Sequence, residues 1–150
     1  MSKPFSLQPL LEIMQERTDE ATRQLGRLIA AEQSAKSRLQ LLEQYREEYA
    51  QKMREAIAQG IAPLALLNYQ DFLGRIDEAV EQQAQAVRQS ERSTAAGQET
   101  WRHHNKRMKA IDTLASRHEE RERHLENKRE QKQQDEFTTR QFSHRQLNED

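Results

Sequence analysis

The 150-residue sequence contains no cysteine, which excludes a disulfide framework, a zinc site built on thiolates and a catalytic thiol. A sequence without cysteine does not indicate whether the protein works in an oxidising or a reducing compartment. The sequence also has no run of 18 apolar residues, and its N-terminus lacks the apolar core and small-residue cleavage site of a signal peptide. We expect a soluble cytoplasmic protein that does not insert directly into a membrane.

Apolar residues are scarce, at 34% of the chain against about 45–50% in ordinary globular domains. A wide core is therefore not expected. Ala, Glu, Lys, Leu and Arg together supply 74 of the 150 residues, a composition typical of long helices and coiled coils. The net charge is only −1 and the apolar residues recur periodically, so the low hydrophobicity indicates helix rather than disorder.

The sequence has no glycine-rich phosphate loop, no nucleophile elbow and no pair of acids in an apolar setting. His118 and His124 lie six residues apart, whereas a zinc-hydrolase helix needs two histidines four apart on one face. His103 and His104 are adjacent and so point in different directions. We therefore expect no catalytic site, no metal and no cofactor, and the protein is predicted not to be an enzyme.

Charge also argues against some partners. Residues 102–150 carry 12 Lys plus Arg and 10 Asp plus Glu, and residues 1–101 carry a net charge of −3. Counted in this way, the chain has no basic stripe of the kind that phosphate contacts require, and its polar faces are mixed rather than rich in Lys and Arg. We expect no nucleic-acid partner.

The first half of the sequence has a strict heptad spacing, with steps of four and three from residue 7 to residue 56. Three polar residues interrupt it at Thr18, Glu32 and Arg46. The other twelve positions are apolar or aromatic: Leu7, Leu11, Met14, Ala21, Leu25, Leu28, Ala35, Leu39, Leu42, Tyr49, Met53 and Ala56. This spacing predicts a helix that packs against a partner helix along one line of residues, with a left-handed supercoil.

Gly60 and Pro63 interrupt the pattern, and both are typical of a boundary between two helices. A second periodic stretch follows, strong at both ends and weak from Gln83 to Gly97. Because a short connection makes consecutive helices antiparallel neighbours, we predict an all-α fold: a two-helix antiparallel coiled-coil hairpin with a longer C-terminal helix. The expected bounds within a single coiled-coil domain, 1–150, are helix 6–59, tip loop 60–63, helix 64–140 and frayed tail 141–150.

Folding the chain about residue 61 leaves residues 116–150 without an intramolecular partner. Apolar residues are sparse there, and an unpaired helix this polar is marginal in water. We therefore expect this overhang to fray until it meets a partner.

Tyr45 and Phe72 lie beside the predicted packing line rather than on it, next to Tyr49 and Leu73. Two interpretations stay open. The rings can broaden the core near the loop, or they can form a partly exposed apolar patch of the kind that marks a partner site.

Several segments together resemble the FliJ family of flagellar type III export proteins. They are Leu39-x-x-Leu42-x-x-Tyr45-x-x-x-Tyr49, Gly60-Ile61, Asn68-Tyr69-Gln70-x-Phe72-Leu73-x-x-Ile76-x-x-Ala79-Val80-Glu81-Gln82, Trp101 with its following basic residues, and Lys132-x-x-Asp135-Glu136-Phe137. The resemblance spans nearly the whole chain and is most specific around the predicted loop.

The resemblance implies a coiled coil similar to the central stalk of rotary ATPases. Such a protein binds the flagellar export ATPase hexamer, promotes its assembly and activity, contacts the export gate protein FlhA, and helps recycle export chaperones. It would work in the cytoplasm, peripherally associated with the inner membrane at the flagellar base. The implied gate-binding residues are Leu42, Tyr45, Tyr49, Phe72, Ile76 and Ala79.

The overhang lies where a stalk would enter an ATPase ring. Our hypothesis is that the open end of the hairpin binds the ATPase through Leu7, Leu11, Met14, Ile111, Leu125 and Phe137. We expect a monomer. Two alternatives remain: a generic coiled-coil scaffold that self-associates through the weak middle stretch, and a chaperone-like binder of exported substrates, which would need exposed apolar surface along its length.

Overall fold

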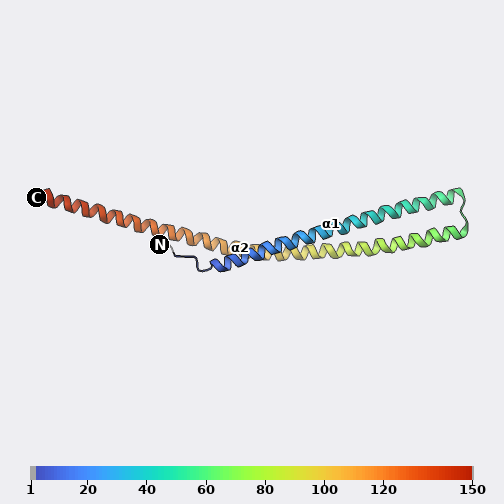
Figure 1. The fold of residues 1–150 in the computed structure, drawn as a ribbon, viewed down its shortest axis with the longest axis horizontal. Helices are drawn as coiled ribbons and strands as arrows, with labels where there is room; N and C mark the ends of the chain where they lie inside the picture. The colour runs from blue at the N-terminus through green and yellow to red at the C-terminus, as the bar shows by residue number, and fades with distance from the viewer. Residues whose placement is uncertain (1–2, 150) are drawn as a thin grey trace. The chain divides into compact units, whose positions relative to one another are not determined.

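The computed structural model describes residues 3–149, which form two α-helices and no strand (Figure 1). Helix α1 is Gln8–Gln59 and helix α2 is Pro63–Glu149. The all-α prediction is confirmed. Neither helix contains a stretch long and apolar enough to span a bilayer.

The helix boundaries follow from local backbone chemistry. The amide of Gln8 donates to the carbonyl of Phe5, so α1 begins two residues after the expected start at residue 6. At the other end Gly60 has φ +87°, a left-handed conformation that suits glycine because it has no Cβ. The Gly60 amide donates to the Ile57 carbonyl, and Pro63 then opens α2, where a missing N–H costs nothing.

Helix α2 continues to Glu149, so the expected helix end near residue 140 is wrong. The tail was predicted as 141–150, and its last residue lies outside the described part of the chain. The physical reason is that the sequence contains neither glycine nor proline after Gly97, and nothing in this stretch stops a helix. Fraying in solution stays a prediction.

The chain divides into two compact units, and each contains residues of both helices. One unit joins residues 3–18 to residues 104–149, and the other consists of residues 19–103.

In the unit of residues 19–103, side chains of α2 donate hydrogen bonds to groups of α1. The Trp101 indole donates to the Thr22 hydroxyl over 2.9 Å, and the Gln83 amide donates to the Ala35 carbonyl over 3.0 Å. The Thr94 hydroxyl lies 3.4 Å from the Leu28 carbonyl. Residues early in α1 thus contact residues late in this part of α2, and two of these bonds use the stretch predicted to pack weakly.

Burial in α1 follows the predicted heptad spacing. From Leu11 to Ala56, every heptad position is buried or half-buried, and Ala50 is the one other residue of α1 that is not exposed. Two of the polar interruptions are satisfied locally: the Thr18 hydroxyl donates to the Met14 carbonyl over 2.8 Å, and Glu32 pairs with Lys36 at 3.7 Å. The third, Arg46, pairs with Asp77 of α2.

At Gly97 of α2, the Leu28 side chain of α1 lies close to the glycine backbone. A Cβ added to Gly97 would lie 2.5 Å from Cδ1 of Leu28 and 3.6 Å from Cδ1 of Leu25. A larger residue cannot be inserted there without displacing the Leu28 side chain.

We therefore expect Gly97→Leu to lower the free energy of unfolding by about 1–3 kcal/mol, the usual cost of overpacking. The matched control is Gly26→Leu on α1, where an added Cβ meets nothing within 4 Å. It should raise stability by roughly 0.5–1 kcal/mol through helix propensity alone. Urea unfolding followed by far-ultraviolet circular dichroism measures both, and equal effects would contradict the close approach.

Candidate functional site

Four aromatic rings gather close to the loop that joins α1 to α2. Tyr45 and Tyr49 come from α1, and Tyr69 and Phe72 come from α2. The Tyr49 ring centroid lies 4.7 Å from that of Phe72 and 5.4 Å from that of Tyr69. Tyr45 meets Phe72 edge-on at 6.5 Å. We call these four residues the aromatic cluster.

The predicted gate-binding residues fall into two groups by exposure. Tyr45 is 48% exposed and Phe72 is 39% exposed, so each offers part of a ring to a partner. Ile76 is only 6% exposed, and Leu42, Tyr49 and Ala79 are half-buried. The structure thus brings Tyr45, Tyr49 and Phe72 into contact, and it places Ile76 in the interior, where it can support a surface without itself being reached.

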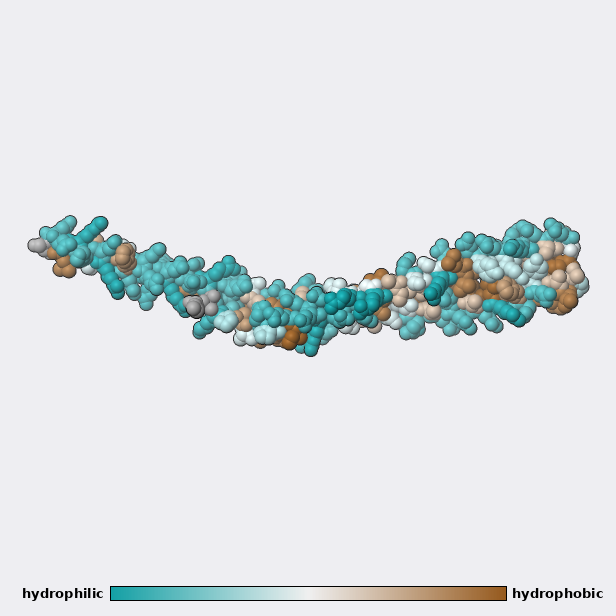
Figure 2. Space-filling view, viewed as in Figure 1, coloured by the Kyte–Doolittle hydropathy of each residue, from teal (hydrophilic) through white to brown (hydrophobic). Residues whose placement is uncertain are grey.

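The sequence reasoning missed other apolar surface in the same region. Leu41, Ile57, Leu64 and Leu67 are all exposed, and Leu64 is the most exposed of them at 72%. Figure 2 shows apolar surface gathered at the end of this unit where α1 joins α2. The run Leu64-Ala-Leu-Leu67 could have predicted this exposed surface. Three leucines within four residues of a helix point in different directions, so they cannot all pack against the same partner helix.

Burial raises the pKa of the Tyr49 phenol above its ordinary value of 10.0, and the neighbouring Tyr69 and Tyr45 raise it further. The arrangement therefore favours the neutral phenol in the folded protein. Beside the cluster, the Arg46–Asp77 ion pair joins α1 to α2 and raises the pKa of the guanidinium.

In the other unit, the N-terminal residues that precede α1 lie against α2. The Lys3 carbonyl lies 2.8 Å from Nε2 of His118, and the Lys3 amide donates to Glu122 over 3.2 Å. The Phe5 ring lies 5.5 Å from the His118 ring. The expectation that α2 has no partner from residue 116 onward is therefore wrong for His118 and Glu122. An extended strand advances about 3.3 Å per residue and a helix only 1.5 Å, so a few non-helical residues reach one more turn of α2.

The predicted ATPase-binding residues are not brought together into one surface. Leu11 and Met14 are each 5% exposed, and Ile111 is half-buried. Leu7, Leu125 and Phe137 are exposed by 37%, 45% and 62%. From residue 123 to residue 149 every side chain is exposed.

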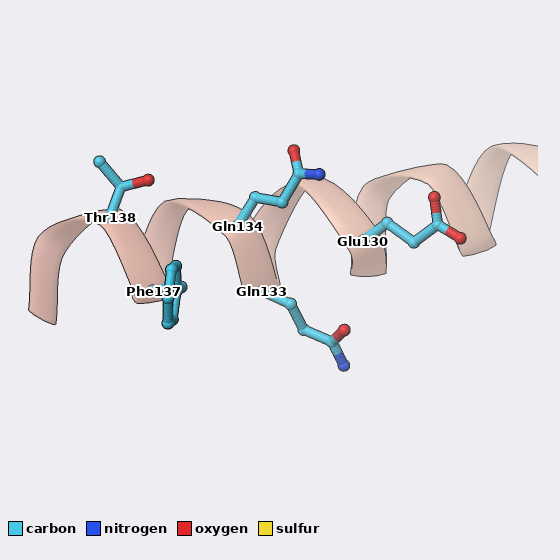
Figure 3. Close-up of a pocket in the computed structure, with 5 residues that line it drawn as sticks. All are labelled: Glu130, Gln133, Gln134, Phe137 and Thr138. Carbon is cyan, nitrogen blue, oxygen red and sulfur yellow. The ribbon is translucent and has the colours of Figure 1, made fainter. Parts of the chain in front are cut away.

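The surroundings of Phe137 show why this segment offers no enclosed site. A shallow hollow beside the ring is lined by Glu130, Gln133, Gln134 and Thr138, which all belong to α2 (Figure 3). In Figure 3 these side chains leave a single helix in different directions. Within residues 3–149, no three His, Asp or Glu side chains are grouped to hold a metal ion.

Comparison with known proteins gives a consistent result. Residues 2–147 match the model of a family described as "Flagellar FliJ protein". A protein of that name from Salmonella typhi is 29% identical over 140 residues, which covers 93% of this chain and 95% of the relative. The protein of the same name from Escherichia coli strain K12 is 28% identical over the same share of each chain.

The raised pKa of Tyr49 predicts a loss of stability in alkali. A group whose pKa is higher in the folded state contributes its full stability below its unfolded pKa, and this contribution disappears as the pH rises through the folded value. The free energy of unfolding should therefore fall more steeply above pH 10 in the wild type than in Tyr49→Phe. Tyr69→Phe, which leaves Tyr49 in place, should keep most of the fall, and identical pH profiles for all three proteins would contradict this account.

Proposed function

The chain belongs to the FliJ family of flagellar proteins, and from that membership we propose that it acts as a stalk-like component of flagellar protein export. It is a non-enzymatic part of the export apparatus. In the proposed mechanism it binds the export ATPase hexamer and promotes its assembly and activity, links it to the gate protein FlhA, and helps return export chaperones.

An antiparallel coiled-coil hairpin is the arrangement we propose for this role. Its support is the heptad pattern of burial in α1 and the order of the bonds Thr22–Trp101, Leu28–Thr94 and Ala35–Gln83. Gln83 and Thr94, in the middle of α2, donate to carbonyls of α1 in the same chain. This favours a monomer over the self-associated scaffold, which would need them at an interface between copies.

The aromatic cluster is the observation that carries the proposal. Tyr45 and Phe72 are large rings held by ring contacts yet exposed by 48% and 39%. Pre-ordered aromatic side chains supply much contact area at a low entropy cost, which is why they are enriched among the residues that dominate interfaces. We propose that they contact FlhA, with Leu42, Tyr49, Ile76 and Ala79 holding them in place.

In the proposal, exposed side chains in the C-terminal part of α2 bind the ATPase. Leu125 and Phe137 would contact the ring directly, as would Leu7. Leu11, Met14 and Ile111 are largely covered, so their proposed part is to hold the helices from which the exposed residues project. Docking on the gate would keep the protein at the cytoplasmic side of the inner membrane, at the flagellar base. A chaperone-like role is less well supported, because exposed large apolar residues are most concentrated near the loop.

The first test concerns the gate. Tyr45→Ala combined with Phe72→Ala should reduce binding to purified FlhA by at least about tenfold, because truncating a dominant interface residue costs 1.4 kcal/mol or more. The free energy of unfolding should fall by only about 1–2 kcal/mol, since both rings are half exposed.

A matched control separates binding from stability. Val87 is 7% exposed and has no proposed partner, so Val87→Ala should cost about 2 kcal/mol in unfolding and leave FlhA binding intact. If both variants lose FlhA binding in proportion to stability, the aromatic cluster is only part of the core.

The second test concerns the ATPase. A chain truncated after Glu126 keeps His118 and Glu122, and with them the contacts to Lys3 and Phe5. We expect it to retain the melting temperature and FlhA binding of the full chain, and to stimulate ATP hydrolysis by the flagellar export ATPase of the same organism less than the full chain does, because it lacks Phe137. Hydrolysis and hexamer formation are measured with no addition, with the full chain and with the truncated chain. Full stimulation by the truncated chain would remove the overhang from the mechanism.

A further inference from the structure

Between residues 107 and 132, one side of α2 carries basic residues and no acidic residue. Steps of three or four residues, which keep positions on one side of a helix, connect Arg107, Ala110, Leu114, Arg117, Arg121, His124, Lys128 and Lys132. No acidic residue occupies any of these positions. We call this set the basic face. The charge count over residues 102–150 missed it because acids on the other sides of the helix nearly cancel the total.

Most acids of this segment lie on another side of the helix, together with Lys109 and Arg123. Asp112, Glu119, Glu126 and Glu130 are spaced by seven, seven and four residues, and each lies about half a helical turn from the basic face. The Glu122 carboxylate accepts a hydrogen bond from the Lys3 amide. Glu120 lies next to the basic face, beside Arg117 and Arg121. Downstream the face ends at Asp135.

The cations of the basic face form no ion pair within the part of the chain that the structure describes. The eight ion pairs of the described residues use cations between Arg23 and Arg102, so they leave the basic face without an acidic partner on its own chain. Arg121 donates from Nε to the Arg117 carbonyl over 3.4 Å, a contact that leaves its terminal nitrogens available. All the positions beyond Leu114 are exposed.

Apolar groups lie within the same face. Leu114 is 39% exposed, and it lines a shallow surface hollow with Arg117, Glu120, Arg121 and His124. Leu125, next to His124 at the edge of the face, is 45% exposed. A surface of this kind combines a line of cations with two aliphatic contacts over roughly 38 Å at 1.5 Å per residue.

We propose that the basic face binds an acidic protein surface, and that in flagellar export this surface belongs to the ATPase ring. The inference rests on the proposed function and adds the chemistry of the contact: carboxylates of the ring facing Arg117, Arg121 and Lys128, with small apolar groups against Leu114. Unpaired cations on one side of a helix steer association and fix its rotational setting more than they add affinity.

A nucleic acid fits the face less well. A helix placed in a groove meets phosphates on several sides, and the side opposite the basic face carries Asp112, Glu119, Glu126 and Glu130. A bilayer also fits less well, because surface helices that enter a membrane bury a broad apolar face, whereas this one offers two leucines and no aromatic ring. A protein surface can contact the basic face alone, without meeting the acidic residues on the other side of the helix.

The test is charge reversal on one side only. In the full-length chain, the face variant carries Arg117→Glu, Arg121→Glu and Lys128→Glu. The matched control carries Lys109→Glu, Arg123→Glu and Arg145→Glu, which change the net charge equally but lie off the basic face. Affinity for the purified export ATPase is measured for the wild type and both variants at low and at moderate salt. The wild type is also tested against vesicles of three parts phosphatidylcholine to one part phosphatidylglycerol and against a DNA duplex.

We expect the face variant to bind the ATPase about tenfold or more weakly, the control to bind like the wild type, and the difference to shrink as salt rises. Equal binding by all three proteins would overturn the basic face and leave the proposed function standing. Equal losses of ATPase affinity in both variants would show that net charge alone determines binding, and this would also overturn the proposed role of the basic face. No ATPase binding by the wild type would remove the proposed function and this inference together. Tighter binding of the wild type to vesicles or DNA, lost in the face variant, would assign the face to another class of partner.

Discussion

Burial in this protein is limited to a line. Only 34% of the residues are hydrophobic, and along α1 from Leu11 onward the residues withdrawn from water are the heptad positions and Ala50. A helix that covers one line of residues leaves most of its circumference to solvent. Side chains off the line are therefore not constrained by packing, and their chemistry can serve contacts with other molecules.

The same limit explains how polar residues can occupy the packing line. Thr18, Gln83 and Thr94 each donate to a backbone carbonyl of α1, so none of these groups is buried without a hydrogen bond. Gln83 and Thr94 reach across from α2, and Gly97 lets Leu28 approach closely. A shift of register would break both bonds and move Leu28 off the glycine. The stretch of α2 that the sequence predicts to pack weakly, from Gln83 to Gly97, thus specifies which residues of α1 and α2 meet.

Much of this could be read from the sequence because heptad spacing is a local property. Steps of four and three located the buried positions of α1, and Gly60 with Pro63 located the connection. The contact of Lys3 and Phe5 with His118 could not be found in this way, since non-helical residues follow no helical period. The end of α2 was predicted wrongly because apolar content is a poor guide to where a helix stops. Low apolar content suggested a stop near residue 140, but no residue after Gly97 breaks a helix.

The candidate surfaces were predictable to different degrees, and the difference is physical. Tyr45 and Phe72 were found because aromatic residues beside a heptad line are few, whereas their exposure depends on how the rings pack against Tyr49. The basic face escaped a count of net charge because sidedness, not total charge, determines what a helix presents. Contacts made by aromatic rings depend on burying apolar area, which salt strengthens or leaves unchanged, while contacts made by exposed cations weaken as salt rises. Salt dependence therefore separates a partner held by the aromatic cluster from one held by the basic face.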